Sequence, residues 1–483
     1  MSDLHKLVKG VIEDIRNHQG HPPFPRDEDD HFPRTIGAGD GRQIHVSRKV
    51  DELITDFAYK MMKHETSLES RFSAKDLTHM VRKAFGPALV KIDLDQDADQ
   101  NAALVLSDVE ESVAKDIDWT LKNGKLEYAF GCTLFSYEDI APFDIGPVCF
   151  EPRRIWLDRK ASDGRWVSVG PDGRIKRFPE KIADGPISKV THRRITQLWQ
   201  GKKLKKRKAS SDAHDEKFIL EAIGDCQYVC SISVPGFGVD AGRHKAMISA
   251  RLALATVSLL WETPSEALKG ISLLADRKHQ YGTTLSFTPD GLMLANRSGS
   301  KRLHAPWVNK DKLEESINRF SDCFAISGEA IKAYLDPVDG SERPVLMNAI
   351  AHALLWFFEG CREMVDQISI VKFAAAMEVL TGRISKKGSQ KAIRSLIESC
   401  FGISESKVIT RDGKTMKEVV EHIYKMGRTR MIHGENEALG NDWSIERASA
   451  EKLARYSLVI YMGRVSENPS FDNPKQLFQQ DGG

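Results

Sequence analysis

The feature that most constrains the fold is a change of pattern near Asn309. Before it, helical periodicity alternates with short β-prone runs; after it, apolar residues recur only at helical spacing. A series of capped amphipathic segments without intervening strands is typical of an all-α domain. We therefore predict a mixed α/β region over residues 1–308, a helical bundle over residues 309–466 and a flexible tail over residues 467–483.

The length of the chain also requires more than one domain. Its 483 residues exceed the roughly 100–200 residues that one hydrophobic core usually organises. A basic run near Lys205 marks a second boundary, so we divide the first region into residues 1–200 and a second α/β subdomain over residues 201–308. The predicted fold class is α+β and multidomain.

Composition excludes several classes of protein. With 41% hydrophobic and 29% charged residues the chain is typical of globular proteins. No stretch approaches the roughly 20 apolar residues of a membrane-spanning helix, and the N-terminus lacks the apolar run of a secretory signal. Seven scattered cysteines suggest no disulfide framework. We expect a cytoplasmic protein without a membrane partner.

The first region contains both helical and β-prone segments. Helical spacing predicts helices over residues 4–15, 46–63 and 76–85, whereas alternation predicts a strand over residues 88–94. The glycine-rich residues 36–41 invite a phosphate-loop interpretation, but no strand precedes them, so we favour a plain turn. Antiparallel hairpins are expected over residues 126–150 and around the turn at residues 288–291, with a strand over 228–234 and a helix over 240–261.

The second region is a succession of helices with recognisable ends. We predict one helix over residues 310–334, a second capped by Ser341, a third over 368–380, and a fourth from Ser389. Thr415 and Glu418 have capping-box spacing and begin a fifth helix that ends at Gly434. The last helix spans residues 444–462. Five or six helices make a bundle.

One run of basic residues stands out between the two α/β parts. Such like-charge blocks beside small polar residues are usually solvated surface loops, which is the interpretation we favour. The alternative is a patch that binds nucleic-acid phosphates by releasing counterions. The candidate phosphate contacts are Lys202, Lys203, Lys205, Lys206, Arg207 and Lys208.

Metal binding has little support in the sequence. Cys226 and Cys230 are the closest cysteine pair, but they lie in an apolar segment without a second pair or a nearby histidine. We interpret both as small buried hydrophobic residues. We expect no metal and no cofactor.

The fifth helix of the bundle carries the residues that point to chemistry. Arg428, Arg430 and His433 follow its apolar stripe. At about 100° per residue, Arg428 and His433 lie about 140° apart on an ideal helix, so one helix alone does not pair them. Two copies that meet across a two-fold axis could bring an arginine of one to a histidine of the other. We therefore expect a homodimer or a higher oligomer.

This combination suits RNA cleavage without metal. Such cleavage needs a base for the 2′-hydroxyl, an acid for the leaving 5′-oxygen and a cation for the phosphorane. His433 precedes Gly434 at a helix end, where the helix dipole favours the protonated imidazole. His433 would supply the acid, and Arg428 the cation. The plain alternative is a structural histidine beside surface arginines.

Residues 424–434 resemble the signature of HEPN ribonucleases, an arginine followed a few residues later by histidine, and especially its Arg-x-Arg-x-x-His-Gly form in the Apea-like group. Residues 372–380 resemble an earlier helix of the same family with an inward glutamate, Glu378. Thr429 stands where family members often carry Asn, Asp, His or Ser. The resemblance covers the C-terminal third and adds Thr429, Arg430, Glu378 and Tyr424 as supporting or RNA-contacting residues.

The resemblance implies a dimeric, metal-independent ribonuclease of a toxin or phage-defence system, which cleaves tRNA or other cellular RNA. It also implies that the N-terminal region silences the enzyme until a phage component is sensed. A second function class stays open: a non-catalytic HEPN module that binds RNA or a partner protein. The sequence leaves open which RNA is cleaved, what triggers the enzyme and which oligomer it forms at rest. It also leaves open whether Arg428 or Arg430 is the principal cation, and whether the basic run binds nucleic acid.

Overall fold

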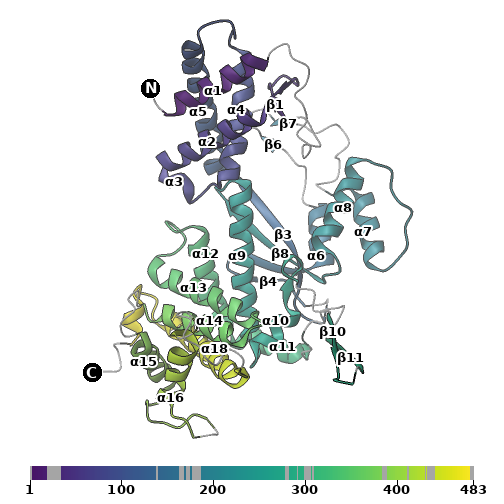
Figure 1. The fold of residues 1–483 in the computed structure, drawn as a ribbon. Helices are drawn as coiled ribbons and strands as arrows, with labels where there is room; N and C mark the ends of the chain where they lie inside the picture. Colours follow the sequence, from purple (N-terminus) through teal and green to yellow (C-terminus); the bar gives the residue numbers. More distant parts are fainter. Residues whose placement is uncertain are drawn as a thin grey trace. The chain divides into compact units, whose positions relative to one another are not determined.

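The chain is mostly helical and divides into two compact units (Figure 1). The computed structural model describes residues 3–18, 34–137, 140–162, 168–169, 175–176, 187–277, 282–290, 292–298, 306, 309–382, 389–410, 413–429, 431 and 441–478. Unit 1 comprises Met1–Glu127, Val167–Phe178 and Ser233–Ala246; unit 2 comprises Tyr128–Trp166, Pro179–Ile232 and Met247–Gly483. Helices with small antiparallel sheets agree with the predicted α+β multidomain class.

Unit 1 is built from amphipathic helices around one core. The rings of Phe57 and Phe85 meet edge to face inside it, with centroids 5.6 Å apart. These helices confirm the three that helical spacing predicts in this region. Its elements are α1 (Asp3–His18), α2 (Arg48–His64), α3 (Thr66–Glu69), α4 (Ala74–Val90), α5 (Ala98–Asn123) and the pairs β1 (Thr35–Gly37) with β2 (Gln43–His45) and β6 (Ser168–Val169) with β7 (Ile175–Lys176).

The strand predicted over residues 88–94 is wrong, because α4 continues to Val90. Ala88 and Leu89 extend the buried stripe that Val81 and Phe85 begin, so packing against the helices of unit 1 overrides the local alternation. The described N-terminal part is therefore largely helical and not an even α/β mixture. The plain turn expected at residues 36–41 is confirmed in part: Ile36 and Gly37 belong to β1, and the residues after them turn the chain into β2 in an antiparallel hairpin.

One buried carboxylate in unit 1 caps two helices. Asp76 accepts hydrogen bonds from the backbone N and Oγ of Ser73, at 3.0 and 2.9 Å, in the capping box of α4. It also accepts from the backbone N of Asp240 at 2.8 Å and of Ala241 at 3.0 Å, in the first turn of α9 (Val239–Ser258). Asp76 thus satisfies N-terminal donors of α4 and α9 together.

A five-stranded sheet, mostly in unit 2, has the strand order β4-β5-β8-β3-β9. The neighbours β4 and β5 form an antiparallel hairpin, as predicted, and Phe150 of β5 faces Cys230 of β8. The hairpin of β10 and β11 around residues 288–290 is confirmed as well. The strands are β3 (Lys125–Thr133), β4 (Phe143–Ile145), β5 (Val148–Pro152), β8 (Tyr228–Pro235), β9 (Ser272–Leu273), β10 (Gly282–Phe287) and β11 (Met293–Ser298).

Three helices beside this sheet share a small core of their own. Trp156, Ile195 and Ile223 are buried in it, together with Val229 of β8. These helices are α6 (Arg153–Ser162), α7 (Lys189–Trp199) and α8 (Ser211–Ile223). The basic run connects α7 to α8, so the packing of these two helices fixes where the run begins and ends.

The C-terminal helices of unit 2 pack around α14 (Figure 1). This helix contacts α13, α18 and η2, and Phe373 on it lies so close to Gly360 of α13 that a Cβ there would meet the ring at 2.9 Å. The remaining helices of unit 2 are α10 (Pro264–Gly270), α11 (Lys310–Arg319), α12 (Ser321–Leu335), α13 (Pro344–Cys361), α14 (Asp366–Leu380), α15 (Ser389–Phe401), α16 (Met416–Glu421), η2 (His422–Thr429), α18 (Ser444–Glu467), and the short 3₁₀ segments η1 (Leu274–Asp276) and η3 (Pro474–Phe478).

Two details of the predicted bundle are wrong. The helix expected over residues 310–334 is broken at Phe320, which separates α11 from α12. Ser341 does not cap α13; its hydroxyl instead donates to Glu329 at 2.6 Å. The cap comes from Asp472, whose carboxylate accepts from the backbone N of Leu346 at 3.0 Å. Asp472 is too distant in sequence for a local pattern to reveal it.

The C-terminal helices are joined to the segment before them by two residues of α18. Glu451 accepts from the backbone N and Oγ of Ser265, at 2.7 and 2.8 Å, in the first turn of α10. Arg455 donates from Nη2 to the carbonyl of Leu259, just beyond α9, at 2.9 Å. An acid at a helix N-terminus and a base beyond a C-terminus both match the helix dipoles. The predicted boundary near residue 309 therefore falls inside unit 2.

Helix α13 is long and apolar enough to cross a membrane when judged by length and composition alone. In the structure 56% of its 18 residues are buried, and it packs against α12, α14 and α18. Core helices of globular proteins commonly have this composition. The finding is weak as an indication of a membrane segment.

Candidate functional site

The candidate site begins with the helix start predicted at Thr415. Thr415 Oγ1 accepts from the backbone N of Glu418 at 3.3 Å, and Glu418 accepts from the backbone N of Thr415 at 2.7 Å. This capping box opens α16, and Val420 and Ile423 continue its buried stripe. The capping box is thus confirmed, and it places the following residues beside α14.

The segment after α16 is a π-helix, η2, and not the α-helix that we expected. A π-helix bonds residue i to i+5, which adds a residue to each hydrogen-bonded turn, and such segments are frequent at functional sites. The angle of about 140° between Arg428 and His433 assumes ideal α-helical geometry, so it does not hold across η2. No residue pattern signals this change of helix type.

Arg428 is held by two side chains. Its Nη1 lies 2.6 Å from Oε2 of Glu378 on α14 and donates to the hydroxyl of Tyr424 at 2.7 Å. The guanidinium also stacks over the Tyr424 ring, 5.1 Å from its centroid. The side chains of Arg428 and Glu378 are 23% and 15% exposed, so the pair is screened only in part by solvent. The structure thus brings three predicted site residues together.

The Nε of the guanidinium has no partner among the described residues. Nη1 makes both contacts, whereas the buried Nε of Arg428 has no hydrogen-bond acceptor in the described part of the chain. Nε and Nη2 form the fork that binds carboxylates or phosphates bidentately. A buried donor without an acceptor is costly, so this edge suits an anionic ligand.

Glu378 is presented by a helix that is fixed at its other end. Near the start of α14, Asp366 pairs with Arg447 of α18 at 2.8 Å, and Lys372 pairs with Glu363 at 2.9 Å. These ties hold α14 against α18 and the end of α13. The orientation of Arg428 therefore rests on a fixed helix and not on a loop.

Several predicted site residues lie outside what the structure describes. Arg430 and His433 are not among the described residues, and only the backbone of Thr429 is described, as the last residue of η2. Of the two residues predicted to be catalytic, the structure therefore describes Arg428, and His433 lies outside the described residues.

A second cluster on η2 is absent from the sequence-based prediction. The His422 ring stacks on Trp443, with centroids 5.7 Å apart, and its Nε2 lies 3.4 Å from Oε1 of Glu446 on α18. His422 is 37% exposed, so it is open to solvent. It precedes the recognised motif, and its partners come from a distant helix, so no local spacing points to it.

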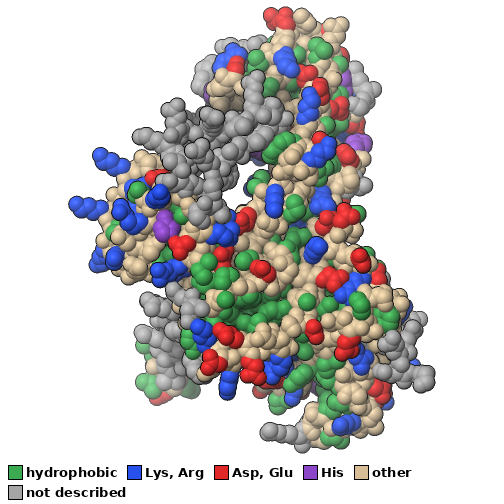
Figure 2. Space-filling view, turned by 180° about the vertical axis from the view of Figure 1, so that it is seen from behind, with side chains coloured by type: hydrophobic (Ala, Val, Ile, Leu, Met, Phe, Trp, Pro, Cys, Tyr) green, Lys and Arg blue, Asp and Glu red, His purple; other side chains and the backbone are tan. Residues whose placement is uncertain are grey.

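The basic run lies on the connection between α7 and α8, away from η2 in sequence and on other elements. Lys202, Lys203, Lys205, Lys206 and Lys208 are exposed, whereas Arg207 is half-buried. Figure 2 shows Lys and Arg side chains gathered on this part of unit 2.

The cysteines behave as predicted. Cys226 and Cys230 are buried, with exposed fractions of 1% and 0%, and both are free thiols. Burial raises the pKa of each thiol, which keeps both protonated. Within the described ranges no group of three or more His, Cys, Asp or Glu side chains could hold a metal ion.

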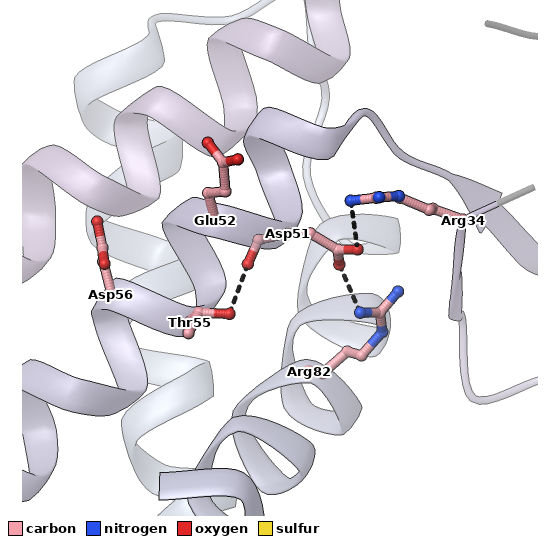
Figure 3. Close-up of a pocket in the computed structure, with 6 residues that line it drawn as sticks. All are labelled: Arg34, Asp51, Glu52, Thr55, Asp56 and Arg82. Atoms are coloured by element: carbon pink, nitrogen blue, oxygen red, sulfur yellow. Dashed lines mark hydrogen bonds and ion pairs between the residues drawn. The ribbon is translucent and has the colours of Figure 1, made fainter. Parts of the chain in front are cut away.

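Unit 1 contains a surface hollow of about 370 Å³ that the sequence did not reveal (Figure 3). Asp51 lies at its centre and pairs with Arg34 Nη1 at 3.4 Å and with Arg82 Nη1. Glu52 and Asp56 also line it, so the acids outnumber the bases among its described lining residues. Because both arginines already face Asp51, these lining residues offer no free cation to an anion, and we assign the hollow no ligand.

Comparison of the chain with protein-family models, with curated proteins and with solved structures found no match. Function must therefore be argued from the site itself.

Proposed function

We propose that the chain is a metal-independent endoribonuclease of HEPN type, with Arg428 and His433 as its catalytic residues. The observation that carries the proposal is the Arg428 guanidinium, which Glu378 and Tyr424 hold while its buried Nε has no acceptor among the described residues. A fixed guanidinium edge is what the crowded charge of a phosphorane requires.

The proposed reaction is an internal displacement at phosphorus. The RNA 2′-oxygen bonds to phosphorus and gives its proton to a base, while the bond to the 5′-oxygen breaks and that oxygen takes a proton from His433. The products are a 2′,3′-cyclic phosphate and a 5′-hydroxyl. Arg428 stabilises the charge on the non-bridging oxygens throughout.

The site is proposed to form between two copies of the chain, with Arg428 of one copy beside His433 of the other. The N-terminal region would hold the enzyme silent until a phage-derived protein is sensed. In this proposal the protein acts in the bacterial cytoplasm as an anti-phage or toxin-type effector, and cleavage of tRNA or other cellular RNA arrests growth.

Growth and RNA integrity test this proposal. Wild type, His433→Ala and Arg428→Ala are expressed with and without phage challenge, and Arg48→Ala serves as a control that loses an exposed arginine ion pair of unit 1. We expect cleaved RNA and growth arrest only with wild type and Arg48→Ala. Cleavage by the purified protein with EDTA present, ending in a cyclic phosphate, would identify the chemistry.

A second function is favoured by the ion pair itself. Because Glu378 already compensates the charge of Arg428, the pair also suits a structural link between α14 and η2 in a module that binds RNA or protein without cleaving it. That module would leave RNA intact, and phage resistance would be equal in wild type and His433→Ala.

A further inference from the structure

The basic connection between α7 and α8 is anchored at both ends. We call residues 202–208 the lysine loop. At its start Gly201 takes a φ of +79°, and the backbone N of Lys202 bonds to the carbonyl of Gln197 at 3.0 Å while that of Gly201 bonds to Leu198 at 2.9 Å. This is a Schellman motif, which fixes the direction in which the chain leaves α7. At its end Ser210 Oγ accepts from the backbone N of Ala213 at 3.2 Å and caps α8.

The lysine loop is also fixed in its middle. Arg194 of α7 donates from Nη2 to the carbonyl of Lys205 at 3.1 Å. Arg207 folds back, donating to the Thr191 hydroxyl at 3.0 Å and pairing with Asp212 of α8 at 2.5 Å. The lysines of the loop are exposed, as expected of a surface loop, but its backbone is held by contacts with α7 and α8.

Three of the four acids of this helix pair, all but Asp215, have ion-pair partners. Glu216 pairs with Arg194 at 2.7 Å and with Arg207 at 3.5 Å, and Glu221 pairs with Lys217 at 3.7 Å. No carboxylate in the described part of the chain pairs with the exposed lysines of the loop. Those unpaired lysines are Lys202, Lys203, Lys205, Lys206 and Lys208. The two arginines thus pair with Asp212 and Glu216, and the lysines of the loop keep their charge for a partner.

The composition of the lysine loop favours a polymer of phosphates over a membrane surface. Surface-bound membrane segments combine basic residues with apolar side chains that enter the lipid. Here Leu204 is the one apolar residue of the loop, and it is half-buried. Trp199 beside the loop is covered by the guanidinium of Arg153, 5.0 Å from its ring centroid. Lysines in the loop can bind phosphates without reading bases.

We propose that the lysine loop is a docking surface for the RNA backbone, separate in the chain from the cleavage site. The choice of RNA as the polyanion rests on the proposed ribonuclease function. The anchored backbone presents the lysines together, which lowers the entropic cost of binding compared with a free tail. Binding should be independent of sequence and sensitive to salt, because each phosphate contact releases counterions.

The test uses the full-length protein and a fluorescent RNA stem-loop with 2′-O-methyl groups at every position. Without 2′-hydroxyls this probe cannot be cleaved, so binding is measured apart from catalysis. The test variant is Lys203→Gln/Lys205→Gln/Lys206→Gln. The control, Lys91→Gln/Lys115→Gln/Lys122→Gln, makes the same change in net charge with lysines of unit 1 that pair with Asp108, Glu111 and Asp118.

We expect the test variant to bind the probe on the order of tenfold more weakly at about 0.1 M salt, and its salt slope to fall by about two to three. The control variant should keep the wild-type affinity and slope. A Lys→Arg triple at residues 203, 205 and 206 should retain binding, and circular dichroism should show wild-type helicity in every variant.

Equal binding by wild type and the test variant would overturn the inference, as would equal weakening by test and control, which would mean a response to net charge alone. Loop-dependent binding to phosphatidylcholine vesicles containing phosphatidylserine, without binding to the RNA probe, would replace RNA by a membrane surface. If the probe binds through the loop but natural RNA stays whole, the docking surface stands and the ribonuclease proposal fails.

Discussion

At the scale of single residues, Arg428 depends on its two neighbours. Glu378→Gln removes the charged partner at 2.6 Å, and Tyr424→Phe removes the hydroxyl acceptor at 2.7 Å. A charge-assisted hydrogen bond contributes about 1.5–3 kcal/mol, which corresponds to roughly a tenfold to hundredfold change in rate. We expect Glu378→Gln to lower kcat of RNA cleavage by that amount, with KM nearly unchanged, and Tyr424→Phe to lower it less.

Glu329→Gln provides the matched control for Glu378→Gln. Glu329 and Arg343 are 28% and 10% exposed, so the control loses an ion pair of similar burial without touching Arg428. If both variants lost activity in parallel with stability, Glu378 would have only a structural role.

Two helical glycines differ sharply in their surroundings. A Cβ at Gly328 of α12 would lie 2.5 Å from the backbone N of Gly146, in the β4–β5 turn, whereas a Cβ at Gly463 of α18 meets nothing within 4 Å. We expect Gly328→Ala to lower the free energy of unfolding by about 1–3 kcal/mol through overpacking. Gly463→Ala should raise it by up to about 1 kcal/mol through helix propensity.

Urea unfolding followed by circular dichroism measures both glycine variants. Equal effects of Gly328→Ala and Gly463→Ala would contradict the close approach of the β4–β5 turn to α12.

Residue patterns predict the site only in part. Arg428, Glu378 and Tyr424 are all site residues predicted from the sequence, and the geometry brings them together. The ion pair itself does not follow from spacing, because Glu378 and Arg428 belong to different helices. His422 escapes prediction for the same reason: Trp443 and Glu446 give it its surroundings from across the bundle.

At the scale of elements, Asp76 makes the stability of unit 1 depend on pH. Burial alone would raise the pKa of Asp76, but the N–H groups of Asp240, Ser73 and Ala241 outweigh it and hold the pKa below the usual 3.8. Because the pKa of Asp76 is lower in the folded than in the unfolded state, its contribution to stability is fully present above pH 3.8. The contribution is lost as the pH falls through the pKa of Asp76 in the folded state.

We expect Asp76→Asn to lower the free energy of unfolding at pH 7 by about 1–3 kcal/mol, because an amide NH₂ would face backbone donors. The variant should also lose part of the acid sensitivity of wild type. Urea unfolding at neutral and acid pH measures both effects. Asp118→Asn, which loses only an exposed i,i+4 pair with Lys122, is the control and should change little.

The elements that sequence predicts well are those fixed by local signals. The capping box at Thr415 and the turn at residues 288–290 lie next to the elements they begin or join. The elements predicted wrongly depend on distant partners: α13 is capped by Asp472, and α4 continues past residue 88 because Leu89 is buried in the core of unit 1. The π-helix η2 has neither kind of signal.

At the scale of the whole molecule, the proposed two-fold site can be tested by mixing inactive variants. Arg428→Ala and His433→Ala are each expected to be inactive. If Arg428 of one copy works with His433 of the other, a mixed dimer has one intact site. Random exchange then restores about a quarter of wild-type cleavage, since half of the dimers are mixed. RNA cleavage after unfolding and refolding the two variants together is the measurement.

A mixture that stays inactive, while sedimentation shows dimers, would place Arg428 and His433 of one chain in the same site. The matched control mixes Arg428→Ala with Tyr424→Phe/Arg428→Ala, in which no dimer regains Arg428.

The predicted order of a mixed region followed by helices matches the order of elements along the chain, but not its division into units. Pattern alone places a boundary near residue 309. From α18, Glu451 caps α10 and Arg455 binds the end of α9. Such long-range contacts leave no periodic pattern in the sequence.

The anchoring of the lysine loop also affects how readily a protease can cleave this chain. Six of its seven residues are lysine or arginine, which makes it the densest group of trypsin targets in the sequence. A protease, however, must first draw a segment out of its fold, and the Schellman motif, the Arg194 contact and the Ser210 cap all resist that step. The rate of cleavage in the loop would therefore measure how often the α7–α8 pair opens. Bound RNA would lower that rate.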